Sequence, residues 1–372
     1  MFIGNYRDRT SVVNMTSTLF SLDMVYDWFS SCLRTHSKCR QPLTQPTTSY
    51  PTRLLDLGPK DSGVCRLIIT AEAAMSSPHE PYLTLSYRWG TDPGLLLLSS
   101  TLHEFRQGKP ISVLPKTFQD LVTVARKFSI RYVWIDALCI IQDSPEDWEV
   151  EALKMRTVYA NSACTVAASV SSNESEGLFR FRDAASFKPG LVNMSLRSGK
   201  TQICQIFERD YWNTNIFSGP LHKRGWVFQE RHLSTRIIYF ANNQILWECL
   251  EGAKCEGFPE GIPHHYSDKD LDQLWQLREK EAEAPGDAND VEMPGSVYVL
   301  WRDLVKKYTG CSFTKVDDKL PAFAGIAKLF QEITRDEYIA GLWRSRLLEG
   351  LDWRVYEPKL KASLAYRAPS WS

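Results

Sequence analysis

The segment RYVWIDALCIIQDSPEDWEVEALKMRTVYA, residues 131–160, determines the fold of this chain. It begins with an apolar strand, Tyr132–Ile135, which ends at Asp136. A short connection leads to Ser144 and Pro145, which open a helix. Serine suits the N-cap, proline suits the first helical position, and the acidic residues that follow favour the positive end of the helix. The segment is therefore a strand, a loop and a helix.

The helix predicted over residues 145–160 has one apolar stripe. At helical spacing this stripe contains Trp148, Ala152, Met155 and Tyr159. Glu151 borders the stripe. A carboxylate in that position is expected to be partly buried at the mouth of the cleft that the strand and the helix form.

The composition excludes several classes of protein. The chain has 372 residues, with 44 Lys and Arg against 44 Asp and Glu, so its net charge does not favour nucleic-acid binding. Its 12 tryptophans indicate a folded protein. The first residues lack the apolar segment of a secretory signal, and the longest aliphatic run, residues 95–98, is too short to span a membrane. We expect a cytoplasmic location.

The nine cysteines are scattered and odd in number, which predicts reduced, buried thiols. A metal site would use Cys32, His36 and Cys39, or Cys249 and Cys255. Neither set matches a paired zinc spacing. The sequence therefore predicts no metal and no cofactor.

Strands and helices alternate in the middle of the chain. Apolar strands are predicted at 82–87, 131–136 and 163–168, with helices at 116–128 and 145–160 between them. Short joints between such elements are typical of a parallel α/β sheet, whose ligands bind beyond the carboxyl ends of the strands.

Polar residues stand at those strand ends. They are Ser86, Tyr87, Arg88 and Trp89 after the first strand, Asp136 after the second and Ser169 after the third. We expect Glu151 to face the same rim.

The regions on both sides of this α/β segment have other sequence patterns. Residues 1–18 look like a polar tail. Other predicted elements are a helix at 19–33, hairpins at 53–70 and 237–249, short strands within 190–209, and helices at 267–283, 296–308, 320–333 and 336–349. We divide the chain into a lead-in helix and hairpin (1–80), an α/β core (81–240) and a mainly helical C-terminal region (241–372).

Several ordered motifs resemble a known family. No glycine-rich phosphate loop, nucleophile elbow or zinc-protease motif is present. LSYRWG (85–90), YVWIDALCIIQD (132–143), DWEVEALKMRTVYANS (147–162) and RGWVFQERHLSTRIIYF (224–240) resemble the fungal heterokaryon-incompatibility (HET) domain. Proteins of this type usually continue beyond a segment like residues 368–372, where this sequence ends.

The resemblance implies a fold and an activity. The HET domain is considered a distant relative of Toll/interleukin-1-receptor-like (TIR) domains, which have a flavodoxin-like parallel sheet flanked by helices. The fold class implied is α/β, with an α+β C-terminal extension. Some TIR domains hydrolyse NAD with a glutamate that follows a tryptophan on the helix after the third strand. By this resemblance Ser86 and Tyr87 match the first strand, and Glu151, after Trp148, matches the catalytic glutamate.

The chemistry of NAD cleavage suits such a site. Breaking the nicotinamide–ribose bond develops positive charge on the ribose, which one carboxylate stabilises without a metal. Trp89 and Trp148 would contact the bases, and Arg88 would bind the pyrophosphate.

Each candidate also has a structural interpretation. Glu151 is placed to pair with Lys154 on the helix surface. Asp136 is placed to cap the following turn, and Arg88 and Trp89 to pack against the loop. We interpret a last group as interface structure, namely Trp226, Gln229 and Glu230.

The prediction is a protein of fungal non-self recognition and programmed cell death with metal-independent NAD glycohydrolase activity. Self-association or an activating partner is expected, because such domains generally act when assembled. One alternative is a non-catalytic signalling module that oligomerises. Another is a HET-like scaffold recruited as a small-molecule biosynthetic enzyme.

Overall fold

The computed structural model describes most of the chain. The described residues are 2–5, 19–40, 50–73, 80–91, 94–183, 187–195, 201–208, 210–263, 271–283 and 292–352. The terminal segment 368–372 and part of the predicted helix at 267–283 lie outside them.

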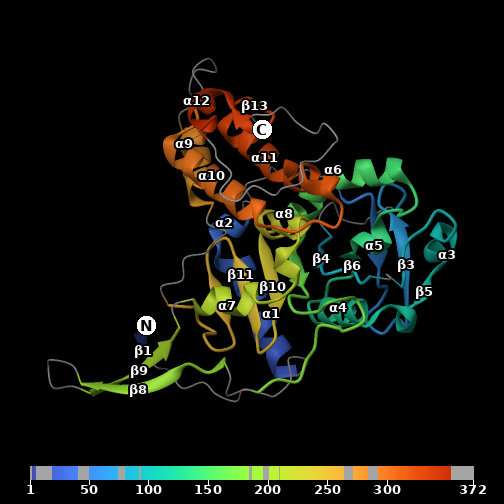
Figure 1. Cartoon of the computed structure of the whole chain (residues 1–372). Helices are drawn as coiled ribbons and strands as arrows, with labels where there is room; N and C mark the ends of the chain where they lie inside the picture. The colour runs from blue at the N-terminus through green and yellow to red at the C-terminus, as the bar shows by residue number, and fades with distance from the viewer. Residues whose placement is uncertain are drawn as a thin grey trace.

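A nine-stranded mixed sheet forms the centre of the molecule, in the order β12-β11-β10-β7-β4-β6-β2-β3-β5 (Figure 1). Its strands are β2 (Arg53–Asp56), β3 (Val64–Ile69), β4 (Tyr82–Ser86), β5 (Lys109–Pro110), β6 (Tyr132–Trp134), β7 (Cys164–Ala167), β10 (Arg236–Phe240), β11 (Ile245–Cys249) and β12 (Ala253–Cys255). The four strands β10, β7, β4 and β6 pair in parallel, and their neighbours on both sides pair antiparallel. The predicted α/β class with parallel core strands is confirmed.

Helices cover both faces of this sheet. The helices of the described residues are α1 (Leu19–Thr35), α2 (Ser37–Arg40), α3 (Leu102–Gln107), α4 (Lys116–Lys127), α5 (Asp136–Cys139), α6 (Pro145–Asn161), α7 (Tyr211–Phe217), α8 (Gly225–Leu233), α9 (Asp272–Glu283), α10 (Gly295–Thr309), α11 (Pro321–Thr334) and α12 (Leu347–Gly350). The residues of β4, β6 and β7 are all buried, as a strand covered on both faces requires.

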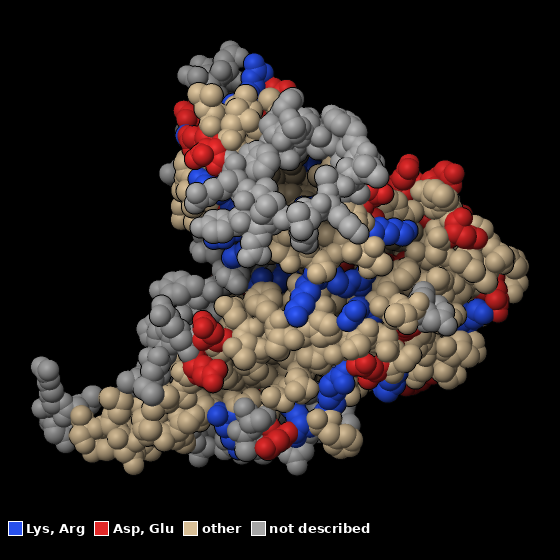
Figure 2. Space-filling view, viewed as in Figure 1, with Lys and Arg blue, Asp and Glu red and all other residues tan. Residues whose placement is uncertain are grey.

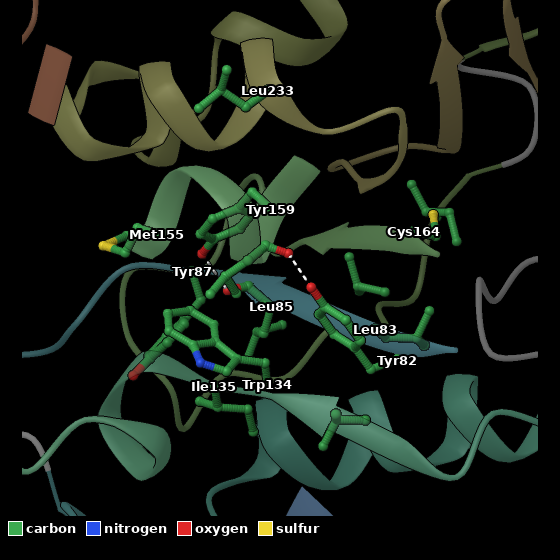
Figure 3. Close-up of a cluster of buried hydrophobic side chains, with 14 of the residues drawn as sticks. Tyr82, Leu83, Leu85, Tyr87, Trp134, Ile135, Met155, Tyr159, Cys164 and Leu233 are labelled. Carbon is green, nitrogen blue, oxygen red and sulfur yellow. Dashed lines mark hydrogen bonds between the residues drawn. The ribbon is translucent and has the colours of Figure 1, made fainter. Parts of the chain in front are cut away.

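The packing places α6 directly over the parallel strands. Figure 3 shows Met155 and Tyr159 of α6 above Leu85 and Trp134, with Leu233 of α8 on the other side of α6. The Tyr159 and Trp134 rings meet edge to face with centroids 5.6 Å apart, and the Tyr159 hydroxyl donates to the Leu85 carbonyl at 3.1 Å. Met155 and Tyr159 of the predicted apolar stripe therefore face the sheet.

The order of the strands creates a switch point. The chain runs from β4 through α4 to β6, then returns over β4 through α6 to reach β7 on the other side. The connection after β4 therefore leads to one side along the sheet, toward β6, and the connection after β7 leads to the other side, toward β10. In open α/β sheets, ligands bind in the crevice at such a point, beyond the carboxyl ends of the strands.

A second sheet lies at one end of the molecule. It contains β1 (Phe2–Asn5), β9 (Thr201–Phe207) and β8 (Gly190–Ser195) in that order. The prediction of a polar tail over residues 1–18 is wrong for residues 2–5, because β1 pairs antiparallel with β9. Backbone hydrogen bonds to a distant strand leave no local sequence signal.

The predicted helix at 336–349 is also wrong. A small hairpin, β13 (Tyr338–Ile339) and β14 (Leu342–Trp343), occupies its first half. A short 3-10 helix (Arg344–Arg346) and α12 follow it. Arg335, Ala340 and Gly341 all have positive φ angles, which end α11 and turn the hairpin. The Asp336 carboxylate then accepts from the Ser345 hydroxyl at 2.6 Å and fixes the hairpin's return.

The C-terminal helices stack over α8 and α6 at the opposite end of the molecule from the second sheet (Figure 1). Gly325 of α11 allows this close approach: its N–H donates to Gln229 Oε1 at 2.9 Å. The arginine–carboxylate pair between Arg156 of α6 and Glu332 of α11 adds a second link. The division of the chain at residues 80 and 240 stays a prediction.

Within the described part of the chain, no helix has both the length and the apolar character that crossing a bilayer requires.

We expect Gly325→Ala to destabilise the protein by about 1–3 kcal/mol, the usual effect of overpacking. A Cβ at this position would lie 2.5 Å from Gln229 Oε1 and 3.0 Å from Arg156 Cβ. Urea unfolding measures the change. The control is Gly295→Ala at the start of α10, where a Cβ meets nothing within 4 Å. Equal stability of the two variants would contradict the close packing of α11.

Candidate functional site

The carboxyl ends of β4 and β6 are joined by a tryptophan–aspartate pair. Trp89 Nε1 donates to Asp136 Oδ2 at 2.8 Å, and the other carboxylate oxygen accepts from the Ala137 N–H at 2.7 Å. Asp136, the first residue of α5, thus accepts from the backbone of the turn that follows it and also holds Trp89. Desolvation raises the pKa of Asp136, while the Trp89 hydrogen bond and the Arg224 charge oppose that rise.

Two long-range contacts fix the loop after β4. The Glu174 carboxylate accepts from the backbone N–H groups of Gly90 and Gly94 at 3.1 and 3.2 Å. Arg224 Nη1 donates to the Tyr87 carbonyl at 2.8 Å. Because Arg224 directly precedes α8, this bond ties the start of α8 to the end of β4.

A chain of hydroxyl groups fixes the other end of α8. Thr84 of β4 and Thr165 of β7 share a hydrogen bond of 2.7 Å, and Thr165 shares another of 2.6 Å with Ser234. The Ser234 hydroxyl also bonds to the Glu230 carbonyl at 2.6 Å. The last turn of α8 is thereby attached to the two strands that flank the switch point.

This arrangement buries the side chain of Glu230 beside Ser86. Both residues are less than one-tenth exposed. Neither Ser86 Oγ nor Glu230 Oε2 has a hydrogen-bond partner among the described residues. Buried polar atoms normally have partners, so these two atoms are suited to meet a hydroxyl group of a ligand.

The surroundings of Glu230 favour its neutral form. Burial raises the pKa of its carboxyl to about 7, and the negative charge of Asp136 adds to the rise. The nearby Ser86 hydroxyl and the Arg224 charge act in the opposite direction. A carboxyl with a pKa near 7 is ready to exchange charge states under physiological conditions, a property common at functional sites.

From the sequence, Trp226, Gln229 and Glu230 are interpreted as interface structure. Two of them, Trp226 and Gln229, do contact another region of the chain. Trp226 Nε1 donates to Asp318 Oδ2 at 3.0 Å, and Gln229 bonds to Gly325, both in the C-terminal region. Glu230 instead lies against Ser86. Glu230 is not among the candidate site residues predicted from the sequence. The pattern that could have indicated it is a glutamate that follows a tryptophan shortly before an apolar strand.

Glu151 has different neighbours. Its side chain is buried, and Oε1 accepts from Thr52 Oγ1 at 2.6 Å and from Lys154 Nζ at 3.1 Å. The pairing with Lys154 is the one its structural interpretation predicted. Oε2 has no hydrogen-bond partner in the described part of the chain. The catalytic role of Glu151 stays a prediction.

Aromatic and basic residues lie around this end of the sheet. Trp148 of α6 and Trp226 of α8 are half-buried and meet edge to face, with ring centroids 6.2 Å apart. Lys and Arg side chains gather over α8 and the end of β4 (Figure 2). Arg88, Lys223 and Arg224 belong to these segments, and the first two are exposed. The site thus combines carboxylates with flat apolar surfaces and positive charge.

Comparison with known families identifies this region. The family model described as heterokaryon incompatibility protein (HET) matches residues 82–230. Residues 82–230 are a HET domain. The match begins at the first residue of β4 and ends at Glu230, so it contains both sides of the switch point. No curated protein and no solved structure matches the chain significantly. The HET domain associates the chain with fungal heterokaryon incompatibility, a form of non-self recognition.

In the HET domain, Glu230→Gln should increase stability at high pH. Folded Glu230 keeps its proton up to about pH 7, whereas a glutamate in the unfolded chain loses it near the ordinary value of 4.5. Native protein therefore binds more protons between these values, and its stability falls as the pH rises through them. The variant lacks this loss. Relative to wild type, it should gain about 1–3 kcal/mol between pH 5 and pH 8.

Denaturant unfolding at both pH values measures this gain. Glu149→Gln, which changes an exposed glutamate of α6, serves as the control. A Glu230→Gln variant whose stability relative to wild type is the same at both pH values would show that the Glu230 carboxyl is ionised in the folded protein at both.

Proposed function

We propose that this HET-domain protein is a cytoplasmic effector of non-self recognition and programmed cell death that hydrolyses the nicotinamide–ribose bond of NAD. The observation that carries the proposal is the buried Glu230 carboxyl beside Ser86, at the switch point between β4 and β7. In this proposal Glu230 is the catalytic carboxylate.

The order of the elements supports this choice. The resemblance to TIR-like domains implies a glutamate that follows a tryptophan on the helix after the third strand. Counted along the chain, the parallel strands are β4, β6, β7 and β10, and α8 lies between the third and the fourth of them. This helix carries Trp226 and Glu230. Helix α6, which carries Glu151, follows the second of these strands.

The reaction needs one negative charge and one water molecule. The C–N bond breaks, its electron pair leaves with nicotinamide, and the ribose carbon becomes positively charged. An ionised carboxylate stabilises that charge in a site shielded from solvent, where electrostatic stabilisation is largest. Water then adds to the carbon and releases one proton, so no metal is required. Ser86, whose hydroxyl lies beside the carboxyl, would bind a ribose hydroxyl.

The remaining candidates would bind the rest of the dinucleotide. Trp148 and Trp226 present aromatic surfaces for a base, and Trp89 is oriented by Asp136. Arg88 and Lys223 are exposed cations suited to the pyrophosphate. Tyr87 is buried and positions the loop through its carbonyl bond with Arg224.

We expect purified protein, assembled by forced clustering, to release nicotinamide from NAD, and Glu230→Gln to lower that rate at least about 100-fold. The wild-type rate should rise between pH 6 and pH 8, because the carboxylate forms as the pH passes its pKa of about 7. Chromatographic measurement of nicotinamide tests both expectations.

Two further variants are measured: Glu151→Gln, which changes the other candidate, and Glu149→Gln, which changes an exposed glutamate and is the control. Full activity in Glu151→Gln together with loss in Glu230→Gln assigns the chemistry to Glu230. Loss only in Glu151→Gln would move it to α6. Clustered wild-type protein that releases no nicotinamide would remove the enzymatic proposal.

A second candidate function is a signalling module that acts by self-association. Helix α6 exposes two apolar side chains three residues apart, Val150 and Leu153, the latter 74% exposed. Apolar residues in such a position are suited to contact a second copy of the chain.

We therefore expect Leu153→Asp to weaken self-association at least about 10-fold, since a buried charge opposes an apolar contact. Analytical ultracentrifugation measures the assembly. Leu348→Asp, at a still more exposed leucine of α12, is the control. If cell killing is lost in Leu153→Asp but persists in Glu230→Gln, the module acts without catalysis. Unchanged assembly in Leu153→Asp would exclude α6 as the contact.

A further inference from the structure

Four potential metal ligands converge beside the edge of the large sheet. They are Cys32, His36, Cys39 and Cys249, whose ligand atoms all lie within 4.8 Å of one another. The sequence placed the first three close together, but Cys249 is 213 residues from His36 along the chain. We propose that these four side chains bind one Zn²⁺ ion in a structural site.

The geometry agrees with tetrahedral coordination. His36 Nδ1 lies 3.3 Å from Cys249 Sγ and 3.9 Å from Cys39 Sγ. Zinc binds sulfur at about 2.3 Å and imidazole nitrogen at about 2.0–2.1 Å, so ligand atoms around a tetrahedral ion lie roughly 3.5–3.8 Å apart. The observed separations need only small side-chain adjustments to reach these values.

Local structure holds the ligands in place. Cys32 lies in the last turn of α1, and the His36 N–H donates to its carbonyl at 3.2 Å. Cys39 lies in α2. Glu251 holds the start of this helix, because the Glu251 carboxylate accepts from the Lys38 N–H at 2.7 Å. Glu251 follows β11, which ends at Cys249. The same contacts therefore bring α2 and the end of β11 together.

A buried arginine balances the charge of the proposed site. Zinc with three thiolates and a neutral imidazole has a net charge of −1. Arg236 Nε donates to Cys32 Sγ at 3.2 Å, and Nη2 donates to the Cys39 carbonyl at 2.9 Å. Among the described residues, no carboxylate lies within salt-bridge distance of this guanidinium. A buried charge without a counter-charge is costly, and the thiolate cluster supplies the counter-charge.

The site is closed and therefore structural. All four coordination positions are occupied by side chains, which leaves none for a substrate or water. Cys32, Cys39 and Cys249 are at most 3% exposed. The ion would connect α1 and α2 to β11, the second strand from one edge of the sheet, with all four ligands outside the HET-domain match.

The alternative is a set of reduced thiols that only pack together. Cys255 provides the matched comparison, because it is equally buried on the neighbouring strand β12 and is not part of the cluster.

Metal analysis of the full-length protein tests the proposal. Protein is purified without metal-affinity resin from cells grown with zinc, then dialysed against metal-free buffer. Mass spectrometry of elements should find about one zinc per chain, the content of a single Cys₃His site. Exchange with Co²⁺ should give the intense ligand-field and thiolate charge-transfer bands of a tetrahedral complex. Less than about one-tenth zinc per chain, or an octahedral cobalt spectrum, would overturn the site.

Variants separate coordination from packing. Cys249→Ser and His36→Ala should each lower zinc content at least about fivefold, because they remove one of four ligands. Cys255→Ser should retain the metal. Cys249→His keeps four ligands and should also retain it, which guards against loss through misfolding alone. Zinc retained in Cys249→Ser and His36→Ala would contradict coordination by this cluster. All these readouts are independent of NAD cleavage.

Discussion

The hydrogen bonds between the hydroxyls of Thr84, Thr165 and Ser234 determine the arrangement of the site. They join β4, β7 and the end of α8 at the point where the chain connections diverge. Because all three hydroxyls are buried, a shift of α8 that broke the Thr165–Ser234 bond would remove a hydrogen bond between two buried groups. The position of Glu230 follows from this constraint, since its own carbonyl accepts the last bond of the chain.

Holding a carboxyl at this place has an energetic cost. Its burial favours the neutral acid, whereas the proposed stabilisation of a ribosyl cation requires the ionised form. A pKa of about 7 is a compromise between the two, because both forms are present near neutral pH. The rest of the structure must compensate for this cost. The closely packed helices α6, α8 and α11 and the large apolar core provide that stabilisation.

The regions outside the HET domain complete the structure. The lead-in hairpin adds β2 and β3 to one side of the parallel strands, while β11 and β12 extend the other side. Helix α11 packs on α8 through Gly325, and α1 packs on α4 through the stacked rings of Phe29 and Phe128, 4.9 Å apart. The domain recognised by sequence comparison is therefore one part of a larger sheet.

Local patterns in the sequence determined most elements of the core. Residues within one or two turns of each other predict the strands at 82–86, 132–134 and 164–167, the N-cap of α6 and its apolar stripe. The resemblance to the HET family depended on these same segments. The helix predicted at 336–349 was wrong because Ala340 and Gly341 adopt positive φ angles that turn a hairpin, which the Asp336–Ser345 hydrogen bond closes.

Only the tertiary structure decided which distant residues meet. Glu230 joins Ser86, and Cys249 joins Cys32, because sheet pairing brings together segments far apart in the chain. Periodicity and capping report the neighbours of a residue along one element, whereas strand order depends on the free energy of the whole packed core. The sequence therefore determined which residue types were available for chemistry, and the fold determined which of them share a site.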